Sequence, residues 1–340
     1  MGGDALQNCT VRRYSPKEYF EITKEVLERL ALEFEEIYVP RKLGNKSSYG
    51  DLDILYVPKE SGPITKERLQ KLFPETKEII IKSPTSHFEL REFQIDIHWC
   101  SPEEFVVAKY WYEFGDSGMI LSMMAHESGF HFGSIGLYVD VVEDEEAKKP
   151  QALEKMFLST VPSKIWEFFG LSLERWEEGF DDEKSCTEYL MSSRFFKPFM
   201  FREGKLSGTK KKRRARQRPL MSFLEKTVAE RFPNESEDPT VEEALAARKK
   251  IKKEALEFFA KKAEYEAFKE DLLKKKATKA PKIDGERLRE AVGLKGKSLG
   301  EFITAFKSQF SDFEKYLEEK PVETVIEDAK CFYNTVYKKQ

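Results

Sequence analysis

The order of apolar and polar residues in the first hundred positions predicts one helix followed by several strands. Between residues 15 and 34 the apolar side chains recur at helical spacing, and Ser15, Pro16 and Glu18 have the types and spacing of a capping box at a helix start. Short runs rich in β-branched and aromatic residues then predict strands at 35–40, 51–58, 77–84 and 92–99. Residues 1–150 therefore indicate a unit of the α+β class.

The pattern becomes mainly helical farther along the chain. A second capped helix is predicted at 101–114, and the aromatic-rich residues 151–200 are interpreted as helical. Residues 236–276 carry a long Lys/Glu/Ala pattern with opposite charges four residues apart, which predicts one solvated helix, and two more amphipathic segments follow. We therefore expect three domains, the last two mainly helical, at 1–150, 151–235 and 236–340.

Charge changes this picture in one place, because the positive charge is local. The chain has 340 residues and a formal net charge of -3, so it lacks the overall basic character of a histone-like protein. Seven of the nine residues from 210 to 218 are basic: Lys210, Lys211, Lys212, Arg213, Arg214, Arg216 and Arg218. This run is a nucleic-acid contact, a nuclear localisation signal or a solvated loop, and we favour contact with nucleic-acid phosphates.

Cysteine usage and hydropathy argue against two other classes of protein. The four cysteines are scattered and form no CxxC pair, so a cysteine zinc site is not expected. No apolar run has the length of a membrane span, and the start MGGDALQN lacks the apolar core of a signal peptide. We expect an intracellular, soluble protein without a membrane partner, cytoplasmic or nuclear, and a viral origin is compatible with this.

Two carboxylates stand inside the apolar run GDLDILY. Side chains alternate between the two faces of a strand, so Asp51 and Asp53 share one face while Leu52 and Ile54 share the other. Asp96 has a similar place in the run FQIDIHW, and neighbouring strands would bring the three carboxylates together on one edge of the sheet. Close carboxylates repel each other, whereas hard cations such as Mg²⁺ or Mn²⁺ bind them. We favour a site for two ions about 3.5–4 Å apart over solvated acids at a strand end.

His98 lies two residues after Asp96 and therefore on the same predicted face. There it either contacts the substrate or a metal-bound water, or it is an ordinary histidine of an edge strand. We favour the second interpretation.

The run GDLDILY, followed by FQIDIHWCSPEEFVVAKYWYEFGDSG and AHESGFHFGSIGLY, resembles the palm of the DNA polymerase β superfamily and is closest to family X DNA polymerases. The resemblance covers roughly residues 35–140. It implies a nucleotidyltransferase palm within 1–150 and a thumb-like helical region at 151–235. It also implies that Asp51, Asp53 and Asp96 are metal ligands and catalytic residues, with Asp96 as the general base.

The resemblance further implies a transferase that moves a nucleoside monophosphate from a nucleoside triphosphate to the 3′-hydroxyl of a nucleic acid and releases pyrophosphate. DNA is expected ahead of RNA as the acceptor. The chain departs from the family at the Gly-Ser pair that grips the triphosphate, where it has Pro40 and Arg41. The same loop offers other candidates for nucleotide binding: Arg41, Lys42, Gly44, Lys46 and Ser47.

Two alternatives stay open at this point. One is a nucleotidyltransferase that acts on the end of an RNA, of the kind that acts on tRNA-like substrates, or on another acceptor. The fold alone does not determine the acceptor. The other is a catalytically degenerate palm that acts as a nucleic-acid-binding protein. The missing Gly-Ser pair favours the second alternative.

Overall fold

The computed structural model describes residues 5–59, 62–145, 147, 151–202, 219–233, 239–278 and 285–339. The chain forms two compact units, Met1–Tyr265 and Glu266–Gln340, and each is described by itself. The domain boundaries expected after residues 150 and 235 both lie inside the first unit.

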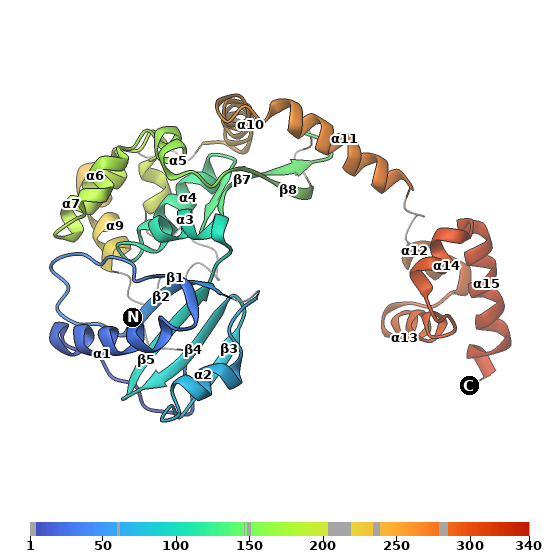
Figure 1. Cartoon of the computed structure of the whole chain (residues 1–340). Helices are drawn as coiled ribbons and strands as arrows, with labels where there is room; N and C mark the ends of the chain where they lie inside the picture. The colour runs from blue at the N-terminus through green and yellow to red at the C-terminus, as the bar shows by residue number, and fades with distance from the viewer. Residues whose placement is uncertain are drawn as a thin grey trace. The chain divides into compact units, whose positions relative to one another are not determined.

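The first unit contains a five-stranded mixed sheet in the order β1-β2-β5-β4-β3 (Figure 1). Its strands are β1 Phe34–Tyr38, β2 Asp51–Pro58, β3 Ile79–Lys82, β4 Thr85–Leu90 and β5 Phe93–Trp99. β2 and β5 run parallel, and the other neighbouring strands run antiparallel. The predicted α+β class is confirmed, although the sequence analysis did not predict β4.

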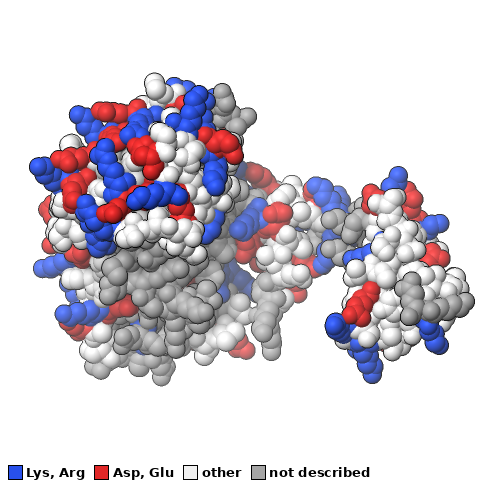
Figure 2. All heavy atoms as spheres, turned by 90° about the horizontal axis from the view of Figure 1, so that it is seen from below, with Lys and Arg blue, Asp and Glu red and all other residues white. Residues whose placement is uncertain are grey.

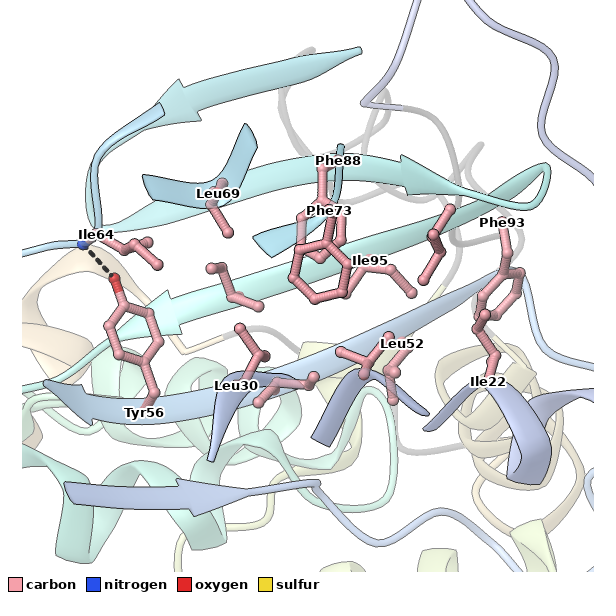
Figure 3. Close-up of a cluster of buried hydrophobic side chains, with 14 of the residues drawn as sticks. Ile22, Leu30, Leu52, Tyr56, Ile64, Leu69, Phe73, Phe88, Phe93 and Ile95 are labelled. Carbon is pink, nitrogen blue, oxygen red and sulfur yellow. Dashed lines mark hydrogen bonds between the residues drawn. The ribbon is translucent and has the colours of Figure 1, made fainter. Parts of the chain in front are cut away.

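One face of this sheet is apolar and is covered by two helices, α1 Pro16–Leu30 and α2 Lys66–Leu72. The capping box predicted for α1 is present, because Ser15 and Glu18 satisfy each other's backbone groups. The residues of this core that are buried include Leu52, Ile54, Ile95, Phe88 and Leu69, several of which Figure 3 shows. The Tyr56 hydroxyl reaches the edge of the core and accepts a hydrogen bond of 3.0 Å from the backbone N–H of Ile64.

The opposite face of the sheet is only partly covered by apolar side chains. Helix α3 Pro102–Tyr112, which is capped by Ser101 as predicted, packs Phe105 and Ala108 against Leu55 and Val57 in the second half of β2. The first half of β2 and the adjoining part of β5 carry polar residues on this face. The candidate site therefore lies where the apolar cover of the sheet stops.

A second, antiparallel sheet lies farther along the first unit, in the order β6-β7-β8. Its strands are β6 His131–Gly133, β7 Gly136–Val142 and β8 Ala152–Ser159. The helical interpretation of residues 151–200 is therefore wrong for β8. There Met156 and Leu158 are buried while Phe157 between them is exposed, which is the alternation of a strand.

Helices precede and follow this second sheet in the chain. They are α4 Ser117–Glu127, α5 Pro162–Phe169, α6 Leu173–Glu178, α7 Glu183–Met191, the 3₁₀ turn η1 Pro198–Phe201 and α9 Pro219–Arg231. The helices after β8 agree with the prediction for the rest of that stretch.

The charged pattern at 236–276 forms two helices where one was predicted. They are α10 Val241–Phe258 and α11 Lys262–Thr278. Ala260 has a positive φ of 53° at the break, and the N–H of Lys261 returns to the carbonyl of Leu256. Leu256 and Tyr265 are both buried, so the break lets residues from both helices pack. Charge pairs four residues apart stabilise either helix and carry no information about this break.

The second unit has its own apolar core. Its helices are α12 Gly285–Val292, α13 Gly296–Lys307, α14 Phe313–Glu319, α15 Val322–Thr335 and the 3₁₀ turn η2 Tyr337–Lys339. Phe302, Phe306 and Phe332 lie at the centre of this core. Across all the ranges that the structure describes, no helix combines the length and the apolar character needed to cross a membrane.

Candidate metal centre

Three aspartates converge on the polar face of the five-stranded sheet. Asp51 and Asp53 lie on β2, Asp96 lies on β5, and the parallel pairing puts Asp53 directly beside Asp96. One carboxylate oxygen from each residue lies within 4.8 Å of the other two. The predicted convergence is confirmed, although it lies at the centre of the sheet and not at one edge, and the donor set of three carboxylates is one that hard divalent cations prefer. Metal binding itself stays a prediction.

Asp53 is held by two side chains. Lys42 Nζ lies 2.8 Å from Oδ2, and His98 Nε2 lies 3.3 Å from Oδ1. Burial by itself would raise the pKa of Asp53, but the Lys42 ammonium and the contact with His98 outweigh it and hold this pKa well below its usual range. Asp53 is therefore an anion, paired with a cation from the preceding loop.

Asp51 has the opposite electrostatic character. Burial, together with repulsion from Asp53 and Asp96, raises the pKa of Asp51 to about 6. Gathering three carboxylates is therefore unfavourable in this face as it stands, and a bound cation would remove that penalty.

Asp96 is oriented by neighbours on its own strand and on β4. Gln94 Nε2 donates to both carboxylate oxygens of Asp96, at 2.9 and 3.0 Å, and Gln94 Oε1 accepts a 3.0 Å bond from the N–H of Ala5. His87 Nδ1 lies 2.8 Å from Asp96 Oδ1. The sequence analysis gave His87 no role, because it did not predict the strand that positions it. The alternation of apolar Phe88 and Leu90 with polar His87 and Glu89 was the available signal.

His98 does not lie on an edge strand, so that interpretation is wrong. β5 runs between β2 and β4, and the imidazole is buried. Besides Asp53, it contacts Thr85 Oγ1 at 2.9 Å and Tyr112 Oη at 3.3 Å, both at Nδ1. These contacts fix the ring beside the three carboxylates.

The five predicted nucleotide-binding residues fall into two groups. Two of them, Arg41 and Gly44, make contacts within the fold. Arg41 forms an ion pair with buried Glu113 at 2.6 and 2.8 Å, and it also donates to the carbonyls of Glu177 at 2.6 Å and Trp176 at 3.2 Å. Gly44 touches the backbone of Asp181, where a Cβ would come within 3.2 Å of Cα. Arg41 and Gly44 therefore join the loop to α6 and the start of α7, and they do not belong to the carboxylate cluster.

A cavity of about 200 Å³ lies beside this ion pair. It is lined by Tyr38, Arg41, Lys109, Tyr110, Glu113 and Glu177.

Among the other candidates on this loop, Lys42 contacts the carboxylate cluster. Lys42 reaches Asp53, as described above, and the Lys46 ammonium lies 4.8 Å above the Tyr49 ring. Burial, reinforced by the neighbouring charge of Lys42, lowers the pKa of Lys46 to about 8. Ser47 is exposed on the same loop. Lys42, Lys46 and Ser47 are thus the candidates that remain for binding a nucleotide.

The predicted nucleic-acid contact at 210–218 lies outside the described residues. On the side of the first unit drawn in Figure 2, Lys and Arg side chains lie interspersed with Asp and Glu. Among the charges that are described there, this mixture gives no single basic stripe.

The chain was compared with protein-family models and with curated proteins, and neither comparison finds a match.

Proposed function

We propose that this chain is a metal-dependent nucleotidyltransferase of the polymerase β type, which adds a nucleoside monophosphate to the 3′-hydroxyl of a nucleic acid. The observation that carries the proposal is the convergence of Asp51, Asp53 and Asp96 within 4.8 Å, from two adjacent parallel strands, on a face that also presents lysine and histidine. Buried like charges are costly to a fold, so their gathering favours a role in chemistry. The expected acceptor is DNA ahead of RNA.

In this proposal Asp51, Asp53 and Asp96 hold two divalent ions. When bound, Mg²⁺ or Mn²⁺ neutralises charge on the phosphates and lowers the pKa of the attacking hydroxyl. The donor set fits such a group, because one carboxylate oxygen from each aspartate lies within 4.8 Å of the other two.

Asp96 has the role of general base. Its Oδ1 accepts from both Gln94 and His87, whereas Oδ2 accepts from Gln94 alone, so Oδ2 has the greater capacity to take a proton. The 3′-oxygen forms a bond to the α-phosphorus, the bond to the pyrophosphate oxygen breaks, and the hydroxyl proton passes to Asp96 Oδ2. Gln94 and His87 keep the carboxylate in position during this transfer.

Lys42 and Lys46 take the role of the missing Gly-Ser pair. Both ammonium groups lie on the loop before β2, where Lys42 contacts Asp53 and Lys46 lies over the ring of Tyr49. Lys42 pairs with Asp53 at 2.8 Å in this structure, and it would be free to bind the triphosphate if a metal ion took its place. Their charge would hold the β- and γ-phosphates, as lysine does in other nucleotide sites.

One observation favours the degenerate palm as the second candidate. Arg41 stands where the family has a serine, and its guanidinium donates to Glu113 and to two backbone carbonyls. At the position where the family binds phosphate, this chain therefore has a residue that holds the fold together. A chain of this kind would bind nucleic acid without transferring a nucleotide.

The test is labelled nucleotide addition by the full chain to single-stranded and primed DNA and RNA, with each nucleoside triphosphate and with Mg²⁺ or Mn²⁺. The Asp53→Ala, Asp96→Asn double variant is run alongside, and Glu36→Gln, an exposed carboxylate on β1, is the matched control. We expect metal-dependent extension in the wild type and the control, with loss in the double variant. Extension that survives the double variant contradicts the proposal, and nucleic-acid binding without extension supports the degenerate palm.

A further inference from the structure

Tyr19 lies on the first turns of α1, the helix that covers the apolar face of the sheet, at the end where β2 and β5 begin. Its ring stacks on Tyr49 with centroids 3.9 Å apart and 13° between the planes, and it meets Phe93 edge-on at 6.2 Å. Phe93 begins β5, and Tyr49 precedes β2 by two residues. These two contacts fix the Tyr19 ring over the ends of the strands that carry the three aspartates.

The Tyr19 hydroxyl is buried, and within the part of the chain that the structure describes no group forms a hydrogen bond with it. A buried hydroxyl without a partner is unfavourable, and such groups are rare in folded proteins. Because the ring is held on two sides, the hydroxyl cannot turn out to solvent without breaking the stack. An orphaned donor in this position indicates a partner that arrives with a ligand.

The surroundings of the hydroxyl identify the kind of ligand. Lys46 lies 4.8 Å over the ring of Tyr49, the stacking partner of Tyr19, and the charges of Lys42, Asp53 and Asp51 also act on the Tyr19 hydroxyl. Burial raises the pKa of Tyr19 to about 12, so the phenol keeps its proton and donates. An ammonium group cannot accept that proton, whereas an anion drawn in by Lys42 and Lys46 can.

We infer that the Tyr19 hydroxyl donates a hydrogen bond to a phosphate oxygen of the bound nucleoside triphosphate, between Lys42 and Lys46. The N-terminal helix thereby becomes part of the nucleotide site, in addition to covering the sheet. This inference rests on the proposed function, because it assumes that the ligand is a triphosphate. Asp53 is not the acceptor in this structure, because no described group forms a hydrogen bond with the Tyr19 hydroxyl.

The chain provides a matched control in Tyr14. Tyr14 also stacks on Phe93, with centroids 4.2 Å apart, but its hydroxyl donates a 2.5 Å bond to the carbonyl of Arg91. Both tyrosines border the same phenylalanine, yet one hydroxyl has a partner in the protein and the other has none. The Tyr→Phe change removes the same atom from both.

The test is calorimetric titration of the full chain with a non-hydrolysable α,β-methylene nucleoside triphosphate in Mg²⁺, together with thermal unfolding of the ligand-free protein. For Tyr19→Phe we expect at least an approximately tenfold weaker affinity, which is the value of one hydrogen bond to an anion, and an unchanged or higher Tm. For Tyr14→Phe we expect the reverse, namely unchanged affinity and a lower Tm. Titration with Mg²⁺-pyrophosphate should show the same loss for Tyr19→Phe, because the contact is to phosphate.

Each other outcome overturns the inference in a distinguishable way. Wild-type binding that Tyr19→Phe leaves unchanged overturns the inference and leaves the proposed function in place. A fall in Tm for Tyr19→Phe equal to that for Tyr14→Phe shows that the hydroxyl has a structural partner, which also overturns it. A wild type that binds neither the nucleotide nor pyrophosphate overturns the proposed function and this inference together.

Discussion

The two faces of the five-stranded sheet are built from alternate residues of the same strands and have opposite chemistry. On the face under α1 and α2, Leu52, Ile54 and Ile97 are fully buried among apolar side chains. On the other face their neighbours in the sequence, Asp53 and Asp96, form the acidic cluster. A shift in register by one residue would exchange the two sets, so the apolar core also determines where the carboxylates point.

The faces differ in what holds them together. The apolar face gains free energy from every side chain that it removes from water. The polar face needs a partner for each group, and it has Lys42 for Asp53 and Gln94 for Asp96, while Asp51 retains a raised pKa. Replacing buried charges with apolar residues often stabilises a protein, so stability does not explain the polar face. One face therefore supports the fold, and the other is the face on which we propose that the chemistry takes place.

The largest expected effect is a loss of activity on the polar face without a loss of stability. Asp96→Asn keeps the size of the side chain but removes the negative charge of a proposed metal ligand and the proposed general base. We expect nucleotide addition to fall by about 10³-fold or more, since each role contributes several kcal/mol to the barrier. The rate is measured by single-nucleotide extension in Mg²⁺, and Tm is recorded on the same samples. A rate within tenfold of the wild type would contradict the assignment of Asp96.

The apolar face should respond in the opposite way. Leu52→Ala leaves a cavity in the core between β2 and the helices, and we expect it to lower the free energy of unfolding by about 2–5 kcal/mol. Leu32→Ala is the control, because Leu32 is 75% exposed and its loss should change stability by no more than about 0.5 kcal/mol. Urea unfolding measures both. If the folded fraction of Leu52→Ala has no activity, the proposal that the apolar face supports only stability is wrong.

An intermediate effect is expected from the residue that positions Asp96. His87→Ala removes the contact to Asp96 Oδ1 but leaves both bonds from Gln94. We expect kcat to fall about 10- to 100-fold, as for other residues that orient a metal ligand, with KM for the nucleotide unchanged. Metal titration should show a weaker apparent affinity in parallel. A change in KM alone would assign His87 to nucleotide binding.

Local patterns were sufficient to predict much of this face. Alternation along β2 and β5 gave the side on which Asp51, Asp53 and Asp96 lie, because the period of a strand is a property of the backbone. The capping residues likewise gave the starts of α1 and α3. These features depend on residues close in sequence.

Contacts between distant residues could not be predicted in the same way. The partner of Arg41 is Glu113, 72 residues away, and only the folded chain shows that this pair occupies the guanidinium. His87 reaches Asp96 because β4 positions it. The sequence analysis did not predict β4, because the strand is short and contains several polar residues. The resemblance to a polymerase palm provided a proposal for the function, and the structure provides the geometry with which to test it.

The smallest effect concerns the dependence of the polar face on pH. Burial and the nearby charge of Lys42 lower the pKa of Lys46 to about 8, from an ordinary 10.5. Between these two values the unfolded chain holds more protons on this residue than the folded chain, so the free energy of unfolding rises with pH in this window. We expect the wild type to gain about 1–2 kcal/mol relative to Lys46→Met from pH 8 to pH 10, a value reduced for partial exposure.

Nucleotide affinity should move in the opposite direction over the same window, because deprotonated Lys46 no longer attracts phosphate. Chemical denaturation of both proteins at pH 8 and pH 10, with nucleotide titrations at each pH, measures the two trends. Parallel stability curves for the wild type and Lys46→Met would show that Lys46 titrates as it does in water. A nucleotide affinity that falls equally in both proteins would assign the loss to another group. If stability rises and nucleotide affinity falls with pH in the wild type, and neither change occurs in Lys46→Met, the buried ammonium of Lys46 lowers stability and contributes to nucleotide binding. Among the described residues of the apolar face, the buried core contains no such group, because its side chains are hydrophobic and gain free energy by leaving water.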